Sequence, residues 1–418
     1  MSSSAPTVSV VIPVYGVEEW LSECLDSVLA QTLSDIEVCC VDDASPDGCP
    51  AILDEYAARD PRVRVLHLTE NRGQGYARNR GIIMARGKWV YLLDSDDMIV
   101  PDALERAVAH AEANELDLLI FNLKIIYESA ELERQMSLDA PGHHGTYEGV
   151  YSGPDLFESF MDQGDWHCYV QCQLLRREYL RESGVWFVDA SSHEDEDFSF
   201  RVLLLAKRAG YLPDRLFVRR YRDGSVMTSA PHPKRFYGYF ICYLSMDRFM
   251  SERGFRTHNA EVNLARIYEK LTRLYRQLSG TCDLESWFKR PHELALYRFF
   301  ASSQKAYLHY GLLSDELIER ARNAKKLYLY GAGIIARNTF EGLVRAGVVV
   351  EGFIVTKAEG NPTALLGRPV RELSSFAEPP EGAVVVLAMS DGYAREAGAA
   401  LDAAGWTWYS RRYGTMGA

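Results

Sequence analysis

Acidic side chains follow two apolar runs of this 418-residue sequence, at the point where each run ends. The run 36–41 is followed by Asp42 and Asp43, and the run ending at Leu93 is followed by Asp-Ser-Asp-Asp. Clustered carboxylates repel one another unless a cation neutralises them, and oxygen ligands suit Mg²⁺ or Mn²⁺. The alternative is an acidic turn that caps the next helix. Because two clusters occur, we predict a divalent-metal site from Asp94, Asp96 and Asp97.

A third acidic cluster, 194–197, opens an amphipathic helix far downstream. Acidic residues favour the first turn of a helix, so Asp195 alone is also compatible with an N-terminal cap. The segment holds four carboxylates, which is more than capping requires. This surplus indicates chemistry in this segment rather than capping alone.

Strand and helix patterns alternate over the first 121 residues and must position these clusters. The apolar runs predict strands at 8–14, 36–41, 63–68, 89–93 and 116–121, with helices between them. Short strands with helical crossovers form a parallel sheet covered on both faces. Ligands bind outside the carboxyl ends of such strands. We therefore expect the acidic clusters to lie at one sheet edge, beside Pro13 and Tyr15.

The remaining sequence predicts two further regions. The segment 231–320 is helical and aromatic, and from Lys325 the strand–helix alternation restarts. Three parts follow: a domain over 1–230, a helical linker or acceptor region over 231–320, and a small α/β domain over 321–418.

In the segment that begins at Lys325, Gly331-Ala332-Gly333 follows a predicted strand, which is the context of a dinucleotide fingerprint. It raises an alternative function, an NAD(P)-dependent oxidoreductase or a nucleotide-binding module. The acid expected at the end of the next strand is missing, since that strand ends at Thr356-Lys357. The sequence therefore favours an accessory module without redox chemistry.

Composition restricts the function classes. The net charge of −12 argues against a nucleic-acid partner. No apolar run approaches the ~18 residues of a membrane span, and residues 1–16 lack the pattern of a secretory signal. Eight cysteines without a Cys-x-x-Cys indicate reduced thiols. We expect a cytoplasmic protein. Its oligomeric state is not readable from the sequence.

Four segments in this order resemble the family-2 glycosyltransferases over about residues 7–230: VSVVIPVYG, CCVDDASPDG, ENRGQGYARNRGIIMARGKWVYLLDSDD and HEDEDF. The resemblance implies the GT-A fold, a UDP-linked nucleotide-sugar donor and a generally inverting reaction. For the segment after 320, it implies the Rossmann-like module appended to some polysaccharide-building relatives. A pure interaction protein with dead sites is disfavoured, because both acidic clusters are intact.

The resemblance also implies donor-binding roles. Pro13 and Tyr15 correspond to residues under the nucleotide base and ribose, and Asp43 to the group that accepts a hydrogen bond from uracil. Further residues correspond to those near the diphosphate: Arg78, Arg220, Arg222 and Ser225.

For catalysis, the resemblance implies that Asp94 and Asp96 form the metal-binding Asp-x-Asp, with Asp97 close by. The pair Glu194-Asp195 matches the catalytic motif, with Asp195 as the base. Two departures occur: Gly16 replaces the usual asparagine, and 171–175 replaces a Trp-x-Lys-Leu-Tyr segment. The second departure puts acceptor choice, not the chemistry, in doubt.

The family builds capsules, exopolysaccharides and lipopolysaccharides, so the resemblance implies a glycan or lipid-linked saccharide as acceptor. A lipid-linked acceptor would bring peripheral contact with the inner face of the cell membrane. The basic and aromatic segment 231–320 is the candidate for that contact.

Overall fold

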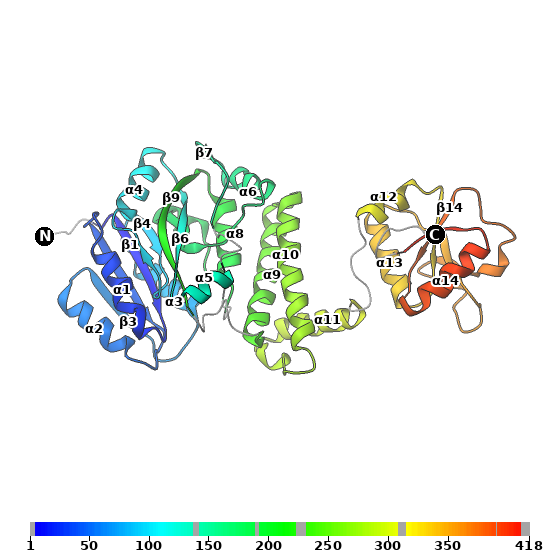
Figure 1. The fold of residues 1–418 in the computed structure, drawn as a ribbon, viewed down its shortest axis with the longest axis horizontal. Helices are drawn as coiled ribbons and strands as arrows, with labels where there is room; N and C mark the ends of the chain where they lie inside the picture. The colour runs from blue at the N-terminus through cyan, green and yellow to red at the C-terminus, as the bar shows by residue number, and fades with distance from the viewer. Residues whose placement is uncertain are drawn as a thin grey trace. The chain divides into compact units, whose positions relative to one another are not determined.

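The structure is a computed structural model that describes residues 5–136, 142–188, 192–222, 231–307, 315–389 and 391–410. The chain divides into two compact units, Met1–Trp287 and Phe288–Ala418 (Figure 1). The boundary predicted at 230 falls inside the first unit. Among the described residues, no helix has the length and apolar character needed to cross a membrane.

The first unit contains a nine-stranded sheet in the order β3-β2-β1-β4-β8-β6-β9-β5, with β7 paired to β9. Its strands are β1 (Val8–Val14), β2 (Ile36–Asp42), β3 (Val63–His67), β4 (Trp89–Leu92), β5 (Met98–Ile99), β6 (Leu118–Tyr127), β7 (Val150–Tyr151), β8 (Gln173–Arg176) and β9 (Ala209–Tyr221). The first four strands in this order are parallel, as expected.

The expectation of a wholly parallel sheet is wrong. Strand β8 lies between β4 and β6 and is antiparallel to both. Strands β5 and β7 are antiparallel to β9. The four residues of β8 are too few to show a periodic pattern, although its first three are buried. The sheet is therefore mixed.

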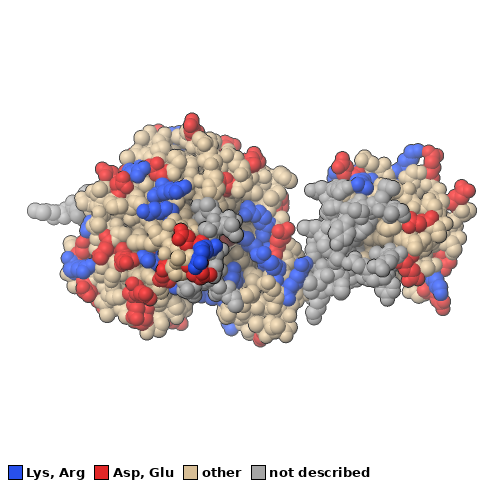
Figure 2. Space-filling view, viewed as in Figure 1, with Lys and Arg blue, Asp and Glu red and all other residues tan. Residues whose placement is uncertain are grey.

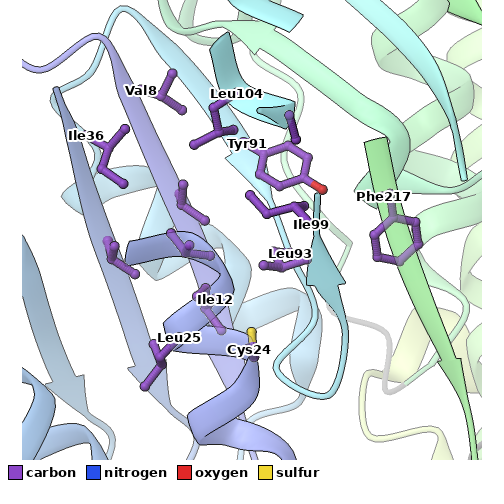
Figure 3. Close-up of a cluster of buried hydrophobic side chains, with 14 of the residues drawn as sticks. Val8, Ile12, Cys24, Leu25, Ile36, Tyr91, Leu93, Ile99, Leu104 and Phe217 are labelled. Carbon is purple, nitrogen blue, oxygen red and sulfur yellow. The ribbon is translucent and has the colours of Figure 1, made fainter. Parts of the chain in front are cut away.

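Apolar packing holds the parallel half of this sheet against helix α1 (Glu18–Leu29). Leu21, Cys24, Leu25 and Val28 recur at helical spacing and are buried. They pack with Val8, Ile12 and Ile36 of β1 and β2 in one cluster (Figure 3). Each fully buried aliphatic side chain contributes about 1.5–3 kcal/mol. This packing fixes the strand ends that carry the acidic residues.

The other helices of this part are α2 (Cys49–Arg59), α3 (Gln74–Met84), α4 (Ala103–Ala113), α5 (Ala130–Met136), α6 (Gly153–Asp162), α7 (Arg177–Ser183) and α8 (Glu194–Leu205), with a short 3₁₀ turn, η1, at Val170–Cys172. Helix α3 begins directly after Gly73, whose φ of 90° favours glycine. Helix α8 begins with the third acidic cluster.

Helices α9 (Pro233–Arg253) and α10 (His258–Leu278) pack against each other, and α9 also packs on α8 (Figure 1). Gly254, with φ of 75°, ends α9, and the Thr257 side chain accepts the Ala260 N–H to cap α10. The unit ends with the 3₁₀ turn η2 (Glu285–Trp287).

The second unit contains a six-stranded sheet in the order β12-β13-β11-β10-β14-β15. All pairs are parallel except β12 with β13. Its elements are α11 (Pro291–Tyr307), α12 (Asp315–Asn323), β10 (Lys326–Tyr330), α13 (Ile334–Arg345), β11 (Gly352–Val355), β12 (Ala364–Leu365), β13 (Arg368–Glu372), the 3₁₀ turn η3 (Leu373–Ser375), β14 (Ala383–Leu387), α14 (Asp391–Ala403) and β15 (Thr407–Ser410). The predicted α/β alternation is confirmed.

Candidate active site

A cavity of about 610 Å³ opens at the carboxyl ends of β1, β2 and β4. Its wall contains every predicted site residue that the structure describes: Pro13, Tyr15, Asp43, Arg78, Asp94, Asp96, Asp97, Glu194, Asp195, Arg220 and Arg222. Ser225 lies outside the described residues. Residues more than 200 positions apart therefore meet in one site.

The Asp43 carboxylate organises the β2 side of the cavity. Its oxygens accept the backbone N–H groups of Arg72 and Gly73, both at 2.7 Å, and so fix the loop that leads into α3. Burial raises the pKa of Asp43. On the neighbouring strand end, the Tyr15 side chain is 49% exposed, which leaves its ring open to a ligand.

Asp94 is held by three side chains. Its Oδ1 accepts hydrogen bonds from Gln74 at 2.8 Å and from Arg78 at 2.6 Å, and its Oδ2 accepts one from Gln171. Gln171 lies in the segment that departs from the family pattern. A residue of the departing segment therefore forms a hydrogen bond with a member of the acidic cluster.

Arg78 lies between two carboxylates rather than open to a diphosphate. Its guanidinium is 2% exposed and donates to Asp94 and, at 2.7 Å, to Glu194. Burial alone would lower the pKa of Arg78, but the charges of Asp94 and Glu194 outweigh it and raise that pKa. This arginine joins the β4 cluster to the α8 cluster.

Asp96 and Asp97 are paired with the end of β9. The Arg222 guanidinium binds Asp96 Oδ2 through Nε at 3.0 Å and Nη2 at 2.9 Å. The Arg220 backbone N–H donates to Asp97 at 2.7 Å, and the Arg220 side chain binds Glu23. Burial, and then the neighbouring aspartate charge, raises the pKa of both Asp96 and Asp97.

The four acidic residues of α8 differ in their partners. Glu194 binds Arg78, Glu196 binds Lys270, and Asp197 binds Arg201. Within the described part of the chain, Asp195 makes no ion pair; its Oδ1 accepts only the N–H of Glu196, at 3.0 Å.

Asp195 also has an unusual acidity. Burial, followed by the charges of Glu194 and Glu196, raises the pKa of Asp195 to about 7. A carboxylate with a pKa near neutral is suited to take a proton, because its basicity matches the working pH. Residue His193 before the helix has φ of 63° and gives α8 no side-chain cap.

Sequence reasoning missed the wall on the side of α9 and α10. Their aromatic stripes indicated core packing, yet one face of each helix borders the cavity. The missed residues are Trp166, His167, Cys168, Gln171, His232, Lys234, Arg235, Tyr239, Asn263, Arg266 and Lys270. The available signal was the spacing of Asn263, Arg266 and Lys270, which places three polar groups on one helix face.

Comparison with known proteins identifies the family. Residues 9–184 match the model for Glycosyl transferase family 2. The glycosyltransferase GlyG of Streptococcus pneumoniae serotype 4 is 30% identical over 228 residues, which cover 53% of this chain and 72% of GlyG. The chain belongs to glycosyltransferase family 2. The α/β fold class predicted from the motifs, with the family's GT-A sheet in the first unit, is confirmed.

Other relatives and one solved structure add detail. The succinoglycan biosynthesis protein ExoO of Rhizobium meliloti is 39% identical over 232 residues, 53% of this chain and 62% of ExoO. The crystal structure of S. aureus TarS 1-349 with UDP-GlcNAc has a TM-score of 0.49 and 22% identity, covering 69% of this chain and 77% of TarS 1-349. The matched regions span 62% to 73% of the first five curated relatives' lengths.

Proposed function

We propose that the chain is an inverting glycosyltransferase. It moves a sugar from a nucleotide-sugar, UDP-linked, to a hydroxyl of a glycan or lipid-linked acceptor in bacterial polysaccharide synthesis. The observation that carries the proposal is Asp195, an unpaired carboxylate among the described residues, in one cavity with the strand-end aspartates. Family membership supports it, and the relative ExoO is named for succinoglycan biosynthesis.

The donor nucleotide would bind over β1 and β2. The half-exposed Tyr15 ring and the neighbouring Pro13 offer a surface for the base and ribose. Asp43 borders the same space, where a carboxylate can accept a hydrogen bond from the N–H of uracil. This arrangement supports the proposal of a uridine donor.

The acidic cluster is the candidate site for a divalent cation, but within the described part of the chain no group of three or more His, Cys, Asp or Glu side chains is arranged to hold a metal ion. Burial and then the charge of Asp94 raise the pKa of the half-buried Asp96, and burial and then the charges of Asp96 and Asp94 raise that of the buried Asp97. A cation would relieve this repulsion. Mg²⁺ commonly takes one or two carboxylates together with substrate phosphates. Asp96 would hold the ion, with Asp94 and Asp97 beside it. The ion would stabilise the negative charge of the leaving diphosphate.

The chain's own residues would perform the remaining steps. Asp195 takes the proton of the acceptor hydroxyl while the oxygen of that hydroxyl bonds to the anomeric carbon. The bond from that carbon to the diphosphate oxygen breaks on the opposite face, so the configuration inverts. Arg220, near the end of β9, and Arg222, directly after it, border the cavity and would contact the diphosphate. Arg78 holds Glu194 in place beside the base.

The alternative of an NAD(P)-dependent oxidoreductase has no support in the second unit. Gly331 and Gly333 follow β10 at the point where the strand order reverses. Thr356 and Lys357, however, follow β11, where a ribose-binding acid is expected. We propose that this unit is an accessory module without redox chemistry.

The decisive experiment is Asp195→Asn. Asparagine keeps the size of aspartate but cannot take a proton, so single-turnover transfer from a labelled UDP-sugar should fall about 10²–10⁴-fold. Calorimetry should give nearly wild-type UDP affinity. Transfer near the wild-type rate would refute the role. The control is Asp54→Asn, on an exposed side chain of α2 that does not border the cavity.

Metal dependence is tested on the same preparations. UDP should bind more tightly with Mn²⁺ than with EDTA, and Asp96→Asn should remove most of that difference. Asp195→Asn should retain it, because Asp195 lies on α8 and is not one of the proposed metal ligands. Equal UDP affinity with EDTA and with Mn²⁺ would rule out the metal role.

A further inference from the structure

Helices α9 and α10 form one wall of the cavity. The roles proposed for the donor-binding residues and the base do not account for the polar residues on this wall. Lys234, Arg235, Arg266 and Lys270 border the cavity from these helices. No Asp or Glu from the described residues of α9 and α10 does so. Figure 2 shows Lys and Arg side chains gathered over these two helices. This wall is therefore electropositive.

Buried hydrogen-bond donors lie in the same wall. Asn263 is 2% exposed and Trp166 5% exposed, and both border the cavity. Asn263 Nδ2 and Trp166 Nε1 have no hydrogen-bond partner among the residues that the structure describes. An unpaired buried N–H is costly unless a ligand or water satisfies it. Both N–H groups can only donate hydrogen bonds, so a ligand that satisfies them must carry acceptor oxygens.

The segments that carry these donors are close together. One turn before Asn263, Asn259 donates to Glu158 at 2.6 Å and to Asp162 at 2.8 Å, both on α6. Trp166 follows α6 by four residues and packs on Phe157 of that helix. The start of α10 is therefore anchored to the segment that carries the indole.

Arg266 completes this group. It lies three residues after Asn263, so the two share one face of α10. Arg266 and His167, which directly follows Trp166, border the same cavity, and the charge of Arg266 adds to the effect of burial in lowering the pKa of His167. Arg266 is exposed and makes no ion pair within the described residues.

This group is separate from the donor side. Lys234 acts electrostatically on Asp43 and Glu194, so it belongs to the nucleotide and diphosphate side. Lys270 is bound to Glu196. Arg266 and Asn263 are thus left as polar residues of the cavity wall that neither the donor nor the base accounts for.

We propose that Arg266, Asn263 and Trp166 form an acceptor subsite that binds an anionic saccharide through a carboxylate or phosphate group. This inference rests on the proposed glycosyl transfer and specifies its acceptor. A neutral sugar would satisfy the buried donors but would offer no counter-charge to Arg266, which makes no ion pair within the described residues. A carboxylate and a phosphate share the required chemistry, namely several acceptor oxygens with negative charge.

The test is saturation-transfer NMR on the full chain with UDP and Mn²⁺, at constant ionic strength. The probes are methyl β-glucoside, methyl β-glucuronide and methyl β-glucoside 6-phosphate. At least one anionic probe should bind about tenfold more tightly than the neutral one, as one charge-assisted hydrogen bond predicts. Preference for the glucuronide alone or the phosphate alone identifies the natural group.

Two variants separate a specific subsite from general charge. Arg266→Gln, on an exposed side chain, should bring the anionic and neutral probes to equal affinity. Arg273→Gln, which removes an exposed cation two turns along α10 outside the cavity, should keep the preference. Equal binding of all probes by the wild type, binding of none, or a preference retained in Arg266→Gln would overturn the proposal.

UDP calorimetry on Arg266→Gln distinguishes the two proposals. We expect unchanged UDP affinity. Weakened UDP binding would assign Arg266 to the donor side and would overturn this subsite. Absence of UDP binding by the wild type would instead overturn the proposed function, while an anion preference lost in Arg266→Gln would leave the subsite standing.

Discussion

Four neighbouring carboxylates open helix α8, and their partners give them different properties. Glu194 is neutralised by a buried arginine, and Asp197 by Arg201. Asp195 has no such cation within the described structure, and burial raises its pKa to about 7. A carboxylate that lacks a cationic partner within an acidic cluster has a raised pKa, and a raised pKa makes it a better base. The same isolation predicts how the protein responds to pH.

The transfer rate should rise with pH through about 7 and then level off, because Asp195 must be ionised to take a proton. In single-turnover assays between about pH 5.5 and 8.5, a range that brackets this pKa, the wild type should show this step. The residual rate of Asp195→Asn should lack it. A wild-type profile that is flat across this range would contradict the assignment.

Stability should show the opposite trend. The folded-state pKa of Asp195 is raised, so protonation favours the folded state, and that contribution is lost as pH rises through about 7. Asp195→Asn does not ionise. Its melting temperature should therefore exceed that of the wild type above pH 7, and the difference should shrink toward pH 4. An unchanged difference across this range would show that Asp195 ionises freely in the folded protein.

Arg78 should be the most sensitive single cation of the site. Its guanidinium is buried between Asp94 and Glu194, so Arg78→Met leaves two carboxylates without their counter-charge. Such a loss costs about 3–5 kcal/mol, measurable by urea unfolding. The control is Arg181→Gln, which breaks an exposed ion pair with Glu178 worth about 1 kcal/mol or less. Equal losses in both variants would contradict a bridging role.

At the scale of elements, the sequence predicted the parallel half of the sheet well. The run 8–14 became β1, Val8–Val14, because continuous β-branched residues suit a strand buried on both faces. Strand β8 escaped prediction because four residues carry too little periodicity. The cavity wall of α9 and α10 escaped because an apolar stripe indicates burial without showing which polar face borders a site. Arg78 borders the cavity, and its role near the diphosphate remains a prediction; its partners Asp94 and Glu194 could not be predicted because they depend on tertiary contacts.

The junction of α9 with the start of α8 should control catalysis. A Cβ on Gly238 of α9 would lie 2.0 Å from the Ser192 backbone oxygen, so the helix approaches closely only because this residue is glycine. Cys242, one turn on, donates to the His193 oxygen at 3.1 Å. The contacts position the residues directly before Glu194 and Asp195.

Gly238→Ala should therefore displace the base. Misplacement by about 1 Å costs up to about 100-fold in rate, while UDP affinity should change much less. Single-turnover transfer and UDP calorimetry measure the two effects. Glu252→Ala is the control, since it introduces alanine at an exposed position of the same helix. If Gly238→Ala transferred sugar at the control's rate, the junction would have no positioning role.

At the scale of the whole molecule, the site and the second unit are separate in sequence. Every residue that borders the cavity lies between Pro13 and Lys270, inside the unit Met1–Trp287. The second unit has its own sheet and its own buried clusters. The division 1–230, 231–320 and 321–418 remains a prediction, but the location of the cavity already makes a truncation informative.

A chain ending at Trp287 should bind UDP with Mn²⁺ within about twofold of the full chain, because it keeps every cavity residue and each coupled contact among them. Circular dichroism would first establish that the shortened chain is folded, and calorimetry would then give the affinity. The full chain should show neither micromolar binding of NAD(H) or NADP(H) nor hydride transfer, since Thr356 and Lys357 replace the ribose-binding acid. A folded shortened chain that fails to bind UDP would show that the second unit contributes to the donor site. Retained UDP binding with lost transfer to a polymeric acceptor would instead assign the second unit to acceptor capture, which is the role that an accessory module without redox chemistry leaves open.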